Sequence, residues 1–350
     1  MNTEQHIAEQ VGTAIETGSI LNIRGGNSKA FYGNPATGEP LDVSGHSGIV
    51  KYDPGELVLT CRAGSRLSEI QAALEANGQH LPFEPPGFGE KATVGGTVAC
   101  GFSGPARPWR GSLRDYLLGV KMVNGVGEVA QFGGQVMKNV AGYDMSRLVA
   151  GSIGTLGVLL ETSFKVLPVP ARERTLVFDC SQEKAIDMIN RWSGRPLPLS
   201  GAFWQEGRLH LRLSGAHSEV DRAVDRLEFT SLLEETTLWS DLREHRLEFF
   251  EKPGQLWRLS VPSATAPLDL EEDCLVDWGG ALRWYVTDLP AEEIRQSAHQ
   301  AGGHATLFRG EDTVDKFHPL PPAMRQIQNR IKHALDPHGV FNPGRMYRNE

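Results

Sequence analysis

Residues 23–29, with the sequence IRGGNSK, place two glycines beside small polar side chains and cations. Because glycine has no Cβ atom, a phosphate can approach the backbone N–H groups of such a turn closely. Asn27 and Ser28 can donate further hydrogen bonds, and Arg24 or Lys29 can neutralise negative charge. The segment therefore indicates a phosphate-bearing ligand. The alternative is a glycine-rich β-turn without a chemical role.

Two more glycine clusters follow along the chain. Residues 92–104 read ATVGGTVACGFSG, and residues 151–158 read GSIGTLGV. Such segments let the backbone wrap a flat, phosphate-bearing ligand at contact distance, although tight packing between layers would also use glycines. The GxxGxxG spacing at 151–158 is not the GxGxxG of a Rossmann turn, and no Walker A sequence occurs. The sequence therefore disfavours Rossmann-type NAD binding and P-loop nucleotides.

Metal and nucleophile chemistry have little support in the sequence. No two of the eleven histidines are separated by two, three or four positions, and no GxSxG motif occurs. Cys61, Cys100, Cys180 and Cys274 are scattered and form no CxxC pair, which favours reduced core thiols. We therefore expect no metal site and no nucleophilic cysteine.

The composition is that of an ordinary globular protein. The chain has 350 residues, 40% of them apolar, and a net charge of −8, which disfavours strong attraction to nucleic acid or anionic lipid. The N-terminus has no signal-peptide pattern, and no segment approaches the roughly 20 apolar residues of a membrane span. A cytoplasmic protein is expected, one that touches a membrane only through partners.

The first 170 residues predict short strands with few helices. A helix is expected over residues 3–17, and another from an N-cap at Ser65 to Gly78. Residues 85–111 hold seven glycines and four prolines, which predicts a shaped loop without regular structure. The expected strands are 20–24, 41–44, 48–52, 56–62, 117–123, 128–132 and 157–167.

Pro168 and Pro170 mark a predicted domain boundary. Residues 171–318 alternate strands, antiparallel hairpins and helices, and residues 319–350 hold a final helix, 322–335, with a Pro/Gly-rich tail. The prediction is an α+β protein with a domain at 1–170, a smaller antiparallel α+β cap at 171–318, and a C-terminal helix and tail that pack back on the first domain. A ligand groove is expected between domain and cap.

In this order and spacing, the three glycine clusters resemble the FAD-binding domain of the vanillyl-alcohol oxidase and para-cresol methylhydroxylase family, abbreviated PCMH. The likeness covers about the first 170 residues. The phrase KNVAGYD at 138–144, Arg147-Leu148 and the ending DPHGVFNPGR at 336–345 resemble the branch of this family that oxidises 2-hydroxy acids. Residues 301–309, AGGHATLFR, extend this likeness along the whole chain.

The resemblance implies bound FAD and a set of residues that hold it. No histidine follows Gly26, where family members with a covalent flavin commonly carry one, so non-covalent FAD is expected. The implied cofactor-binding residues are Arg24, Gly25, Gly26, Asn27, Ser28, Pro86, Thr93, Gly95, Gly96, Thr97, Gly101, Ser103, Gly104, Asp115, Gly154, Thr155, Leu156, Gly157, Val158 and Asn342.

Two functions follow from the resemblance. In one, the chain is the FAD-binding subunit of a complex that oxidises glycolate, or a related 2-hydroxy acid such as D-lactate, to the 2-oxo acid. His304, flanked by glycines, is the candidate base, with a hydrogen bond at a strand end as the alternative. In the other, the flavin only passes electrons between a second, catalytic FAD-binding subunit and an iron–sulfur subunit.

The second function explains why the paired histidines that bind a metal in related 2-hydroxy acid dehydrogenases are missing here. A stand-alone oxidase of some other alcohol is a third possibility. It would need a complete active site in residues 171–320, where the tryptophans are expected to be core or interface anchors.

Overall fold

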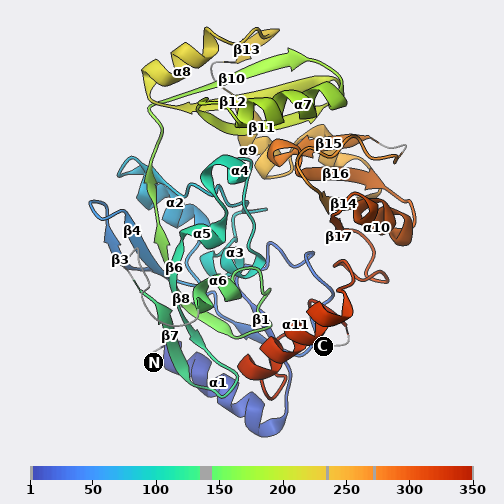
Figure 1. Ribbon diagram of the computed structural model, residues 1–350. Helices are drawn as coiled ribbons and strands as arrows, with labels where there is room; N and C mark the ends of the chain where they lie inside the picture. Colours follow the sequence, from blue (N-terminus) through green and yellow to red (C-terminus); the bar gives the residue numbers. More distant parts are fainter. Residues whose placement is uncertain (1–2, 135–143, 234–235, 271–272, 349–350) are drawn as a thin grey trace. The chain divides into compact units, whose positions relative to one another are not determined.

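A computed structural model describes residues 3–134, 144–233, 236–270 and 273–348 (Figure 1). The chain forms two compact units. The first unit comprises residues 1–102, 112–168 and 319–350, and the second comprises residues 103–111 and 169–318. Of the motif at 138–144, residues 138–143 lie outside the described residues.

The first unit is built on a five-stranded antiparallel sheet of order β3-β4-β8-β6-β7. Its strands are β3 (Ile49–Asp53), β4 (Val58–Arg62), β8 (Val158–Lys165), β6 (Leu117–Val123) and β7 (Val129–Gly133). Leu59, Val120 and Phe164 belong to one buried apolar cluster, which also receives Leu67 and Ile70 from a helix. Val158 and Leu160 belong to a second cluster with Ile7 and Val11.

Strand β1 (Leu21–Arg24) leads the chain into the glycine-rich turn, and β2 (Glu39–Asp42), which follows the turn, pairs with β1 in parallel. The C-terminal tail joins this pair through a bridge between Leu21 and Phe341. A short pair, β5 (Gln79–His80) and β9 (Leu167–Pro168), completes the sheets. Among the described residues of this unit, the helices are α1 (Thr3–Thr17), α2 (Leu67–Glu75), α3 (Val94–Cys100), α5 (Leu113–Tyr116), α6 (Met145–Val149) and α11 (Pro322–Leu335).

The second unit is an eight-stranded antiparallel sheet with helices. In order, its strands are β13 (Ser231–Leu233), β10 (Arg172–Asp179), β12 (Arg208–Gly215), β11 (Leu199–Gln205), β15 (Cys274–Asp277), β16 (Leu282–Thr287), β14 (Gln255–Ser260) and β17 (His304–Arg309). The helices are α4 (Arg107–Arg110), α7 (Gln182–Ser193), α8 (His217–Val224), α9 (Leu238–Arg243) and α10 (Ala291–Gln300), with short 3-10 turns η1 (Glu248–Glu251) and η2 (Trp278–Gly280).

The α+β class is confirmed, and the helices expected at 3–17 and 322–335 have those bounds. The N-cap prediction is wrong: α2 begins at Leu67, and Ser65 instead exchanges hydrogen bonds with the backbone of Gly48. The prediction of a loop without regular structure over 85–111 is also wrong. Thr93 caps helix α3 inside it, because small residues are compatible with a short, tightly packed helix.

The division into units differs from the predicted domains at residues 103–111 and at residues 169 and 170. Residues 103–111, expected in the first domain, belong to the second unit. The indole Nε1 of Trp278 donates to the Gly104 carbonyl at 3.0 Å, and Arg110 donates to the Ser214 carbonyl at 2.9 Å. These long-range bonds join the segment to strands and turns far along the chain.

Candidate cofactor site

A cavity of about 560 Å³ lies in the first unit at the end of β1. This volume is within the range of small-molecule and cofactor sites. The cavity is lined by Arg24, Gly25, Gly26, Asn27, Asp42, Ser44, Ser47, Gly64, Arg66, Glu69, Lys91 and Thr93. Five of the predicted cofactor-binding residues therefore meet at one place: Arg24, Gly25, Gly26, Asn27 and Thr93.

The turn after β1 requires glycine. A Cβ atom on Gly26 would stand 1.3 Å from the Lys91 carbonyl oxygen, and one on Gly25 would stand 2.3 Å from the Thr93 hydroxyl oxygen. Both distances are far inside van der Waals contact, so the turn and residues 91–93 form one wall of the cavity. Asn27 has φ of 58°, a left-handed conformation that asparagine tolerates better than most residues.

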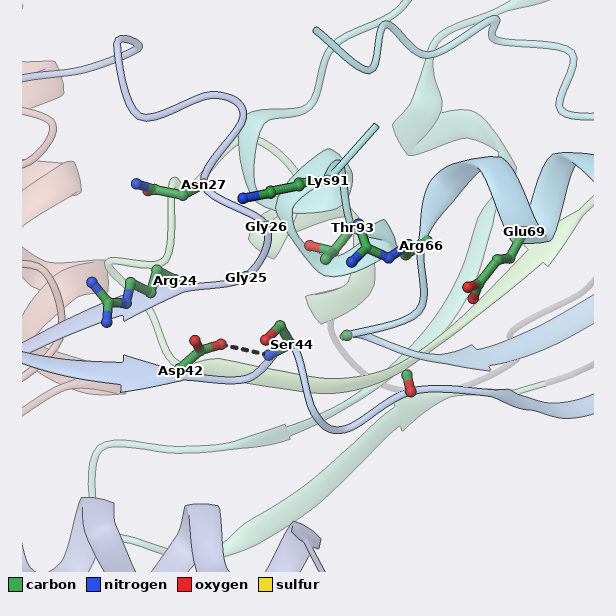
Figure 2. Close-up of a pocket in the computed structure, with 12 residues that line it drawn as sticks. Arg24, Gly25, Gly26, Asn27, Asp42, Ser44, Arg66, Glu69, Lys91 and Thr93 are labelled. Carbon is green, nitrogen blue, oxygen red and sulfur yellow. Dashed lines mark hydrogen bonds between the residues drawn. The ribbon is translucent and has the colours of Figure 1, made fainter. Parts of the chain in front are cut away.

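Positive charge gathers at this wall. Figure 2 shows the nitrogen-bearing ends of Arg24, Asn27 and Lys91 pointing to the same side of the Gly25–Gly26 turn. Asp42, which also lines the cavity, accepts a hydrogen bond from the Ser44 N–H at 2.8 Å. Two cations and an amide donor beside a glycine turn fit the pyrophosphate of a dinucleotide.

Ser28 and Lys29 do not line the cavity but hold the turn in place. The Ser28 hydroxyl donates to the Gly87 carbonyl at 2.8 Å, and the Lys29 ammonium donates to the same oxygen at 3.2 Å. Pro86 is buried beside that carbonyl. The contacts observed for Ser28 therefore position the loop.

The GGT segment forms the first turn of α3. Thr93 accepts a hydrogen bond from the Gly96 N–H, and Thr97 is buried with its hydroxyl donating to the Thr93 carbonyl. Gly95 allows close packing, since a Cβ atom there would lie 2.7 Å from that of Ala63. At the other end, Gly101 is the left-handed C-cap.

The loop at 151–158 is held by the C-terminal tail. The Asn342 side chain is buried, donates to the Ile153 carbonyl at 2.8 Å, and accepts from the Ile23 N–H at 2.8 Å. A Cβ atom added to Gly154 would lie 2.6 Å from the side-chain nitrogen of Asn342. Thr155 donates to the Ser152 carbonyl. Both polar groups of Asn342 are thus used to join β1, the loop and the tail.

The remaining predicted cofactor residues have structural contacts. Leu156 and Val158 are buried in the core, and Gly157 packs against Met122 and Val123. At the start of α5, the Asp115 carboxylate accepts hydrogen bonds from the Ser112 hydroxyl and N–H. Desolvation by burial would raise the pKa of this carboxyl, but the two hydrogen bonds and the positive charge of nearby arginines outweigh it, so the pKa is lowered. Ser103 and Gly104 belong to the second unit. For all the residues in this paragraph that were predicted to bind the cofactor, that role stays a prediction.

Sequence reasoning missed seven residues of the cavity wall. These are Asp42, Ser44, Ser47, Gly64, Arg66, Glu69 and Lys91. They come from β2, the following loop, the α2 start and the segment before α3, so no single motif contains them. The position of Lys91, a cation two residues before Thr93, was the one signal in the sequence that could have indicated a wall residue. Its proximity to Gly26 depends on tertiary packing.

In the second unit, His304 begins β17 and is exposed as a whole residue. Partial burial of the ring and the nearby Arg258 guanidinium lower its pKa, so the imidazole is neutral at pH 7. The His318 ring lies 6.4 Å away between centroids. A neutral, accessible imidazole is competent to accept a proton, as the predicted base requires.

The tryptophans of this unit are largely buried, as expected of core anchors. Trp192, Trp239, Trp257, Trp278 and Trp284 are at most 8% exposed. The Trp278 ring has the Arg107 and Arg258 guanidinium carbons 4.2 and 4.9 Å from its centroid. All four cysteines are free, and Cys61 and Cys274 are buried.

Comparison with known proteins defines first the class and then the family. The FAD binding domain family matches residues 1–133, which include the whole glycine-rich turn and the GGT helix. A solved alkyldihydroxyacetonephosphate synthase shares the fold, with a TM-score of 0.70 at 14% identity over 98% of this chain and 75% of that one. The protein is therefore of the PCMH-type FAD-binding class and binds FAD.

The particular family follows from closer relatives. The chain is 49% identical to glycolate oxidase subunit GlcE of Escherichia coli K12, over 98% of this chain and 97% of that protein. It is 32% identical to glycolate oxidase subunit GlcD of Bacillus subtilis 168, over 40% of this chain and 31% of that protein. The chain belongs to the glycolate oxidase subunit GlcE family, and is an FAD-dependent oxidoreductase subunit. Among the described residues, no helix is both long and apolar enough to cross a membrane.

Proposed function

We propose that this chain is the FAD-binding subunit of a complex that oxidises glycolate, or a related 2-hydroxy acid such as D-lactate, to the 2-oxo acid. The observation that carries the proposal is the cationic cavity beside the Gly25–Gly26 turn, in a chain 49% identical to a glycolate oxidase subunit along nearly its whole length. Bound FAD supplies the hydride acceptor. The protein supplies the cradle that binds and orients it.

The roles of individual residues follow from the cavity. Arg24 and Lys91 would neutralise the pyrophosphate and Asn27 would donate a hydrogen bond to it, while Gly25 and Gly26 let the turn pack closely against residues 91–93. Asn342 positions the 151–158 loop. We propose that the flavin is held without a covalent bond, because Asn27 and Ser28 stand after Gly26. Denaturation that leaves yellow colour on the polypeptide would contradict this.

His304 is proposed to accept the substrate hydroxyl proton, since its depressed pKa keeps a lone pair available at neutral pH. The test is anaerobic reduction of the flavin in the purified chain by glycolate or D-lactate. Bleaching in the wild type that is lost in His304→Gln, but kept in the exposed control His333→Gln, supports the catalytic role. Unchanged bleaching in His304→Gln removes His304.

A second function, electron transfer without substrate oxidation, is favoured by a different observation. Within the described residues of the second unit, no three His, Cys, Asp or Glu side chains gather closely enough to hold a metal. Such a subunit would relay electrons between a catalytic flavoprotein and an iron–sulfur subunit. A flavin that neither acid bleaches in the isolated chain, but that is reduced in the assembled complex, supports this alternative.

The proposed partners are a second FAD-binding subunit and an iron–sulfur subunit, with a cytoplasmic location and membrane contact only through partners. The names of the relatives describe subunits of one oxidase, which supports a heteromeric complex. Co-purification of this chain from its own cells tests the assembly. Recovery of the active chain alone, with full glycolate turnover, would contradict it.

A further inference from the structure

Glu4, His46 and Glu161 come together in the first unit although they are far apart in sequence. Glu4 lies in the first turn of α1, His46 in the loop after β2, and Glu161 on β8. Each offers one ligand atom, and these three atoms lie within 4.8 Å of one another. Small side-chain rotations would place each of these atoms about 2.1 Å from a bound zinc ion, the usual distance between zinc and a nitrogen or oxygen ligand.

His46 is the unusual member of this cluster. The residue is 4% exposed, and its buried Nε2 has no hydrogen-bond partner among the described residues. Backbone hydrogen bonds hold the main chain at this position, since the His46 N–H donates to the Val43 carbonyl and the His46 carbonyl accepts from the Gly64 N–H. Burial, chiefly, lowers the pKa of His46, so the ring keeps a lone pair at neutral pH. A buried imidazole nitrogen without a partner is costly unless a ligand satisfies it.

Two carboxylates and two cations, Arg62 and Lys121, surround the cluster, so a dication can enter only when Lys121 leaves. Lys121, opposite Glu161 in the β6–β8 register, has its ammonium 2.7 Å from Glu4 and 3.9 Å from Glu161. One ammonium faces two carboxylates and makes no hydrogen bond with His46. The Lys121 side chain is 25% exposed, so it can move into solvent when an ion enters.

We propose that Glu4, His46 and Glu161 form a binding site for a divalent transition metal ion, with Zn²⁺ as the expected occupant, and that Lys121 occupies its place when the metal is absent. One imidazole and two carboxylates favour zinc over calcium or magnesium, which prefer oxygen ligands alone. The ion would join helix α1 to the central sheet. This departs from the sequence-based expectation of no metal site.

The experiment measures zinc binding to the full FAD-loaded chain, by equilibrium dialysis and elemental analysis after chelator treatment. One tight zinc per chain is expected in the wild type. His46→Gln and Glu161→Gln should each weaken binding at least about tenfold, the scale of loss seen on disturbing metal sites. Lys121→Met should strengthen binding about fivefold, because it removes the competing cation.

Matched controls are His6→Gln, on the same helix as Glu4, and Glu128→Gln, an exposed carboxylate of the same unit; both should bind zinc as the wild type does. Zinc should raise the melting temperature of the wild type but not of His46→Gln. The proposal is overturned when wild type and His46→Gln bind zinc equally, or when Lys121→Met does not bind it more tightly. The comparison of Lys121→Met with the wild type tests the proposal even if a variant of Glu4, His46 or Glu161 fails to fold.

Discussion

The two units assemble their chemistry in different ways. In the first, residues 24–27, which are continuous in sequence, deliver two glycines, an amide and the Arg24 guanidinium to the cavity wall, and β1 leads directly into them. In the second, His304, Arg258 and Trp278 lie on different strands and turns of one sheet, and no short motif contains them. Part of the cavity wall in the first unit is therefore continuous in sequence, whereas the residues proposed for substrate chemistry in the second unit are not.

The largest expected effect tests the local character of the first unit. Gly26→Val should abolish FAD retention, because the Cβ atom would meet the Lys91 carbonyl at 1.3 Å. Gly45→Ala is the matched control in the next loop, where an added Cβ meets nothing within 4 Å. The ratio of flavin to protein absorbance measures both. A Gly26→Val protein that keeps its flavin would show that the turn does not form the cofactor wall.

Next in size is Asn342, which connects the tail to the first unit. Asn342→Leu leaves the Ile153 carbonyl and the Ile23 N–H without partners, at a cost of about 3 kcal/mol in the free energy of unfolding of that unit. Urea unfolding followed by flavin fluorescence reports it. Ser28→Ala, which removes one hydrogen bond in the same unit, should cost only about 1 kcal/mol. Equal losses in both variants would contradict the central role of Asn342.

The second unit should lose stability in mild acid. Burial lowers the pKa of His210 from 6.5 to about 4, and the Phe203 ring stacks on it. The imidazole is neutral in both states above pH 6.5, whereas below that pH the unfolded chain takes up the proton first. Stability is thus lost as pH falls from 6.5 toward 4, by about 2 kcal/mol at pH 5. Unfolding of wild type and His210→Gln at pH 7 and 5 measures it, and the variant should lose less.

The smallest effect distinguishes charge from shape in the cavity. Lys91→Met should weaken FAD binding about tenfold, and less at high salt, because a solvent-accessible cation beside a phosphate is screened. Lys51→Met, an exposed lysine on β3, is the control. Titration of the FAD-free protein with FAD at two ionic strengths gives the dissociation constants of both variants and the wild type. An unchanged affinity in Lys91→Met would assign the pyrophosphate to the backbone alone.

The sequence by itself determined the elements and the cofactor motif. Periodicity and terminators located α1 and α11 at their observed bounds, and the IRGGNSK segment marked the cavity wall, because helix faces and phosphate turns depend on neighbouring residues. The prediction for residues 85–111 was wrong. The glycines there were expected to exclude a helix, whereas in the structure Gly95 lets helix α3 pack against Ala63.

Only the tertiary structure decided which distant residues meet. Lys91 reaches the turn at Gly26, Asn342 joins two segments over 180 residues upstream, and Glu4, His46 and Glu161 converge from three elements. The reason is physical: strand register and core packing set these distances, and they depend on many weak contacts spread along the chain rather than on any local pattern.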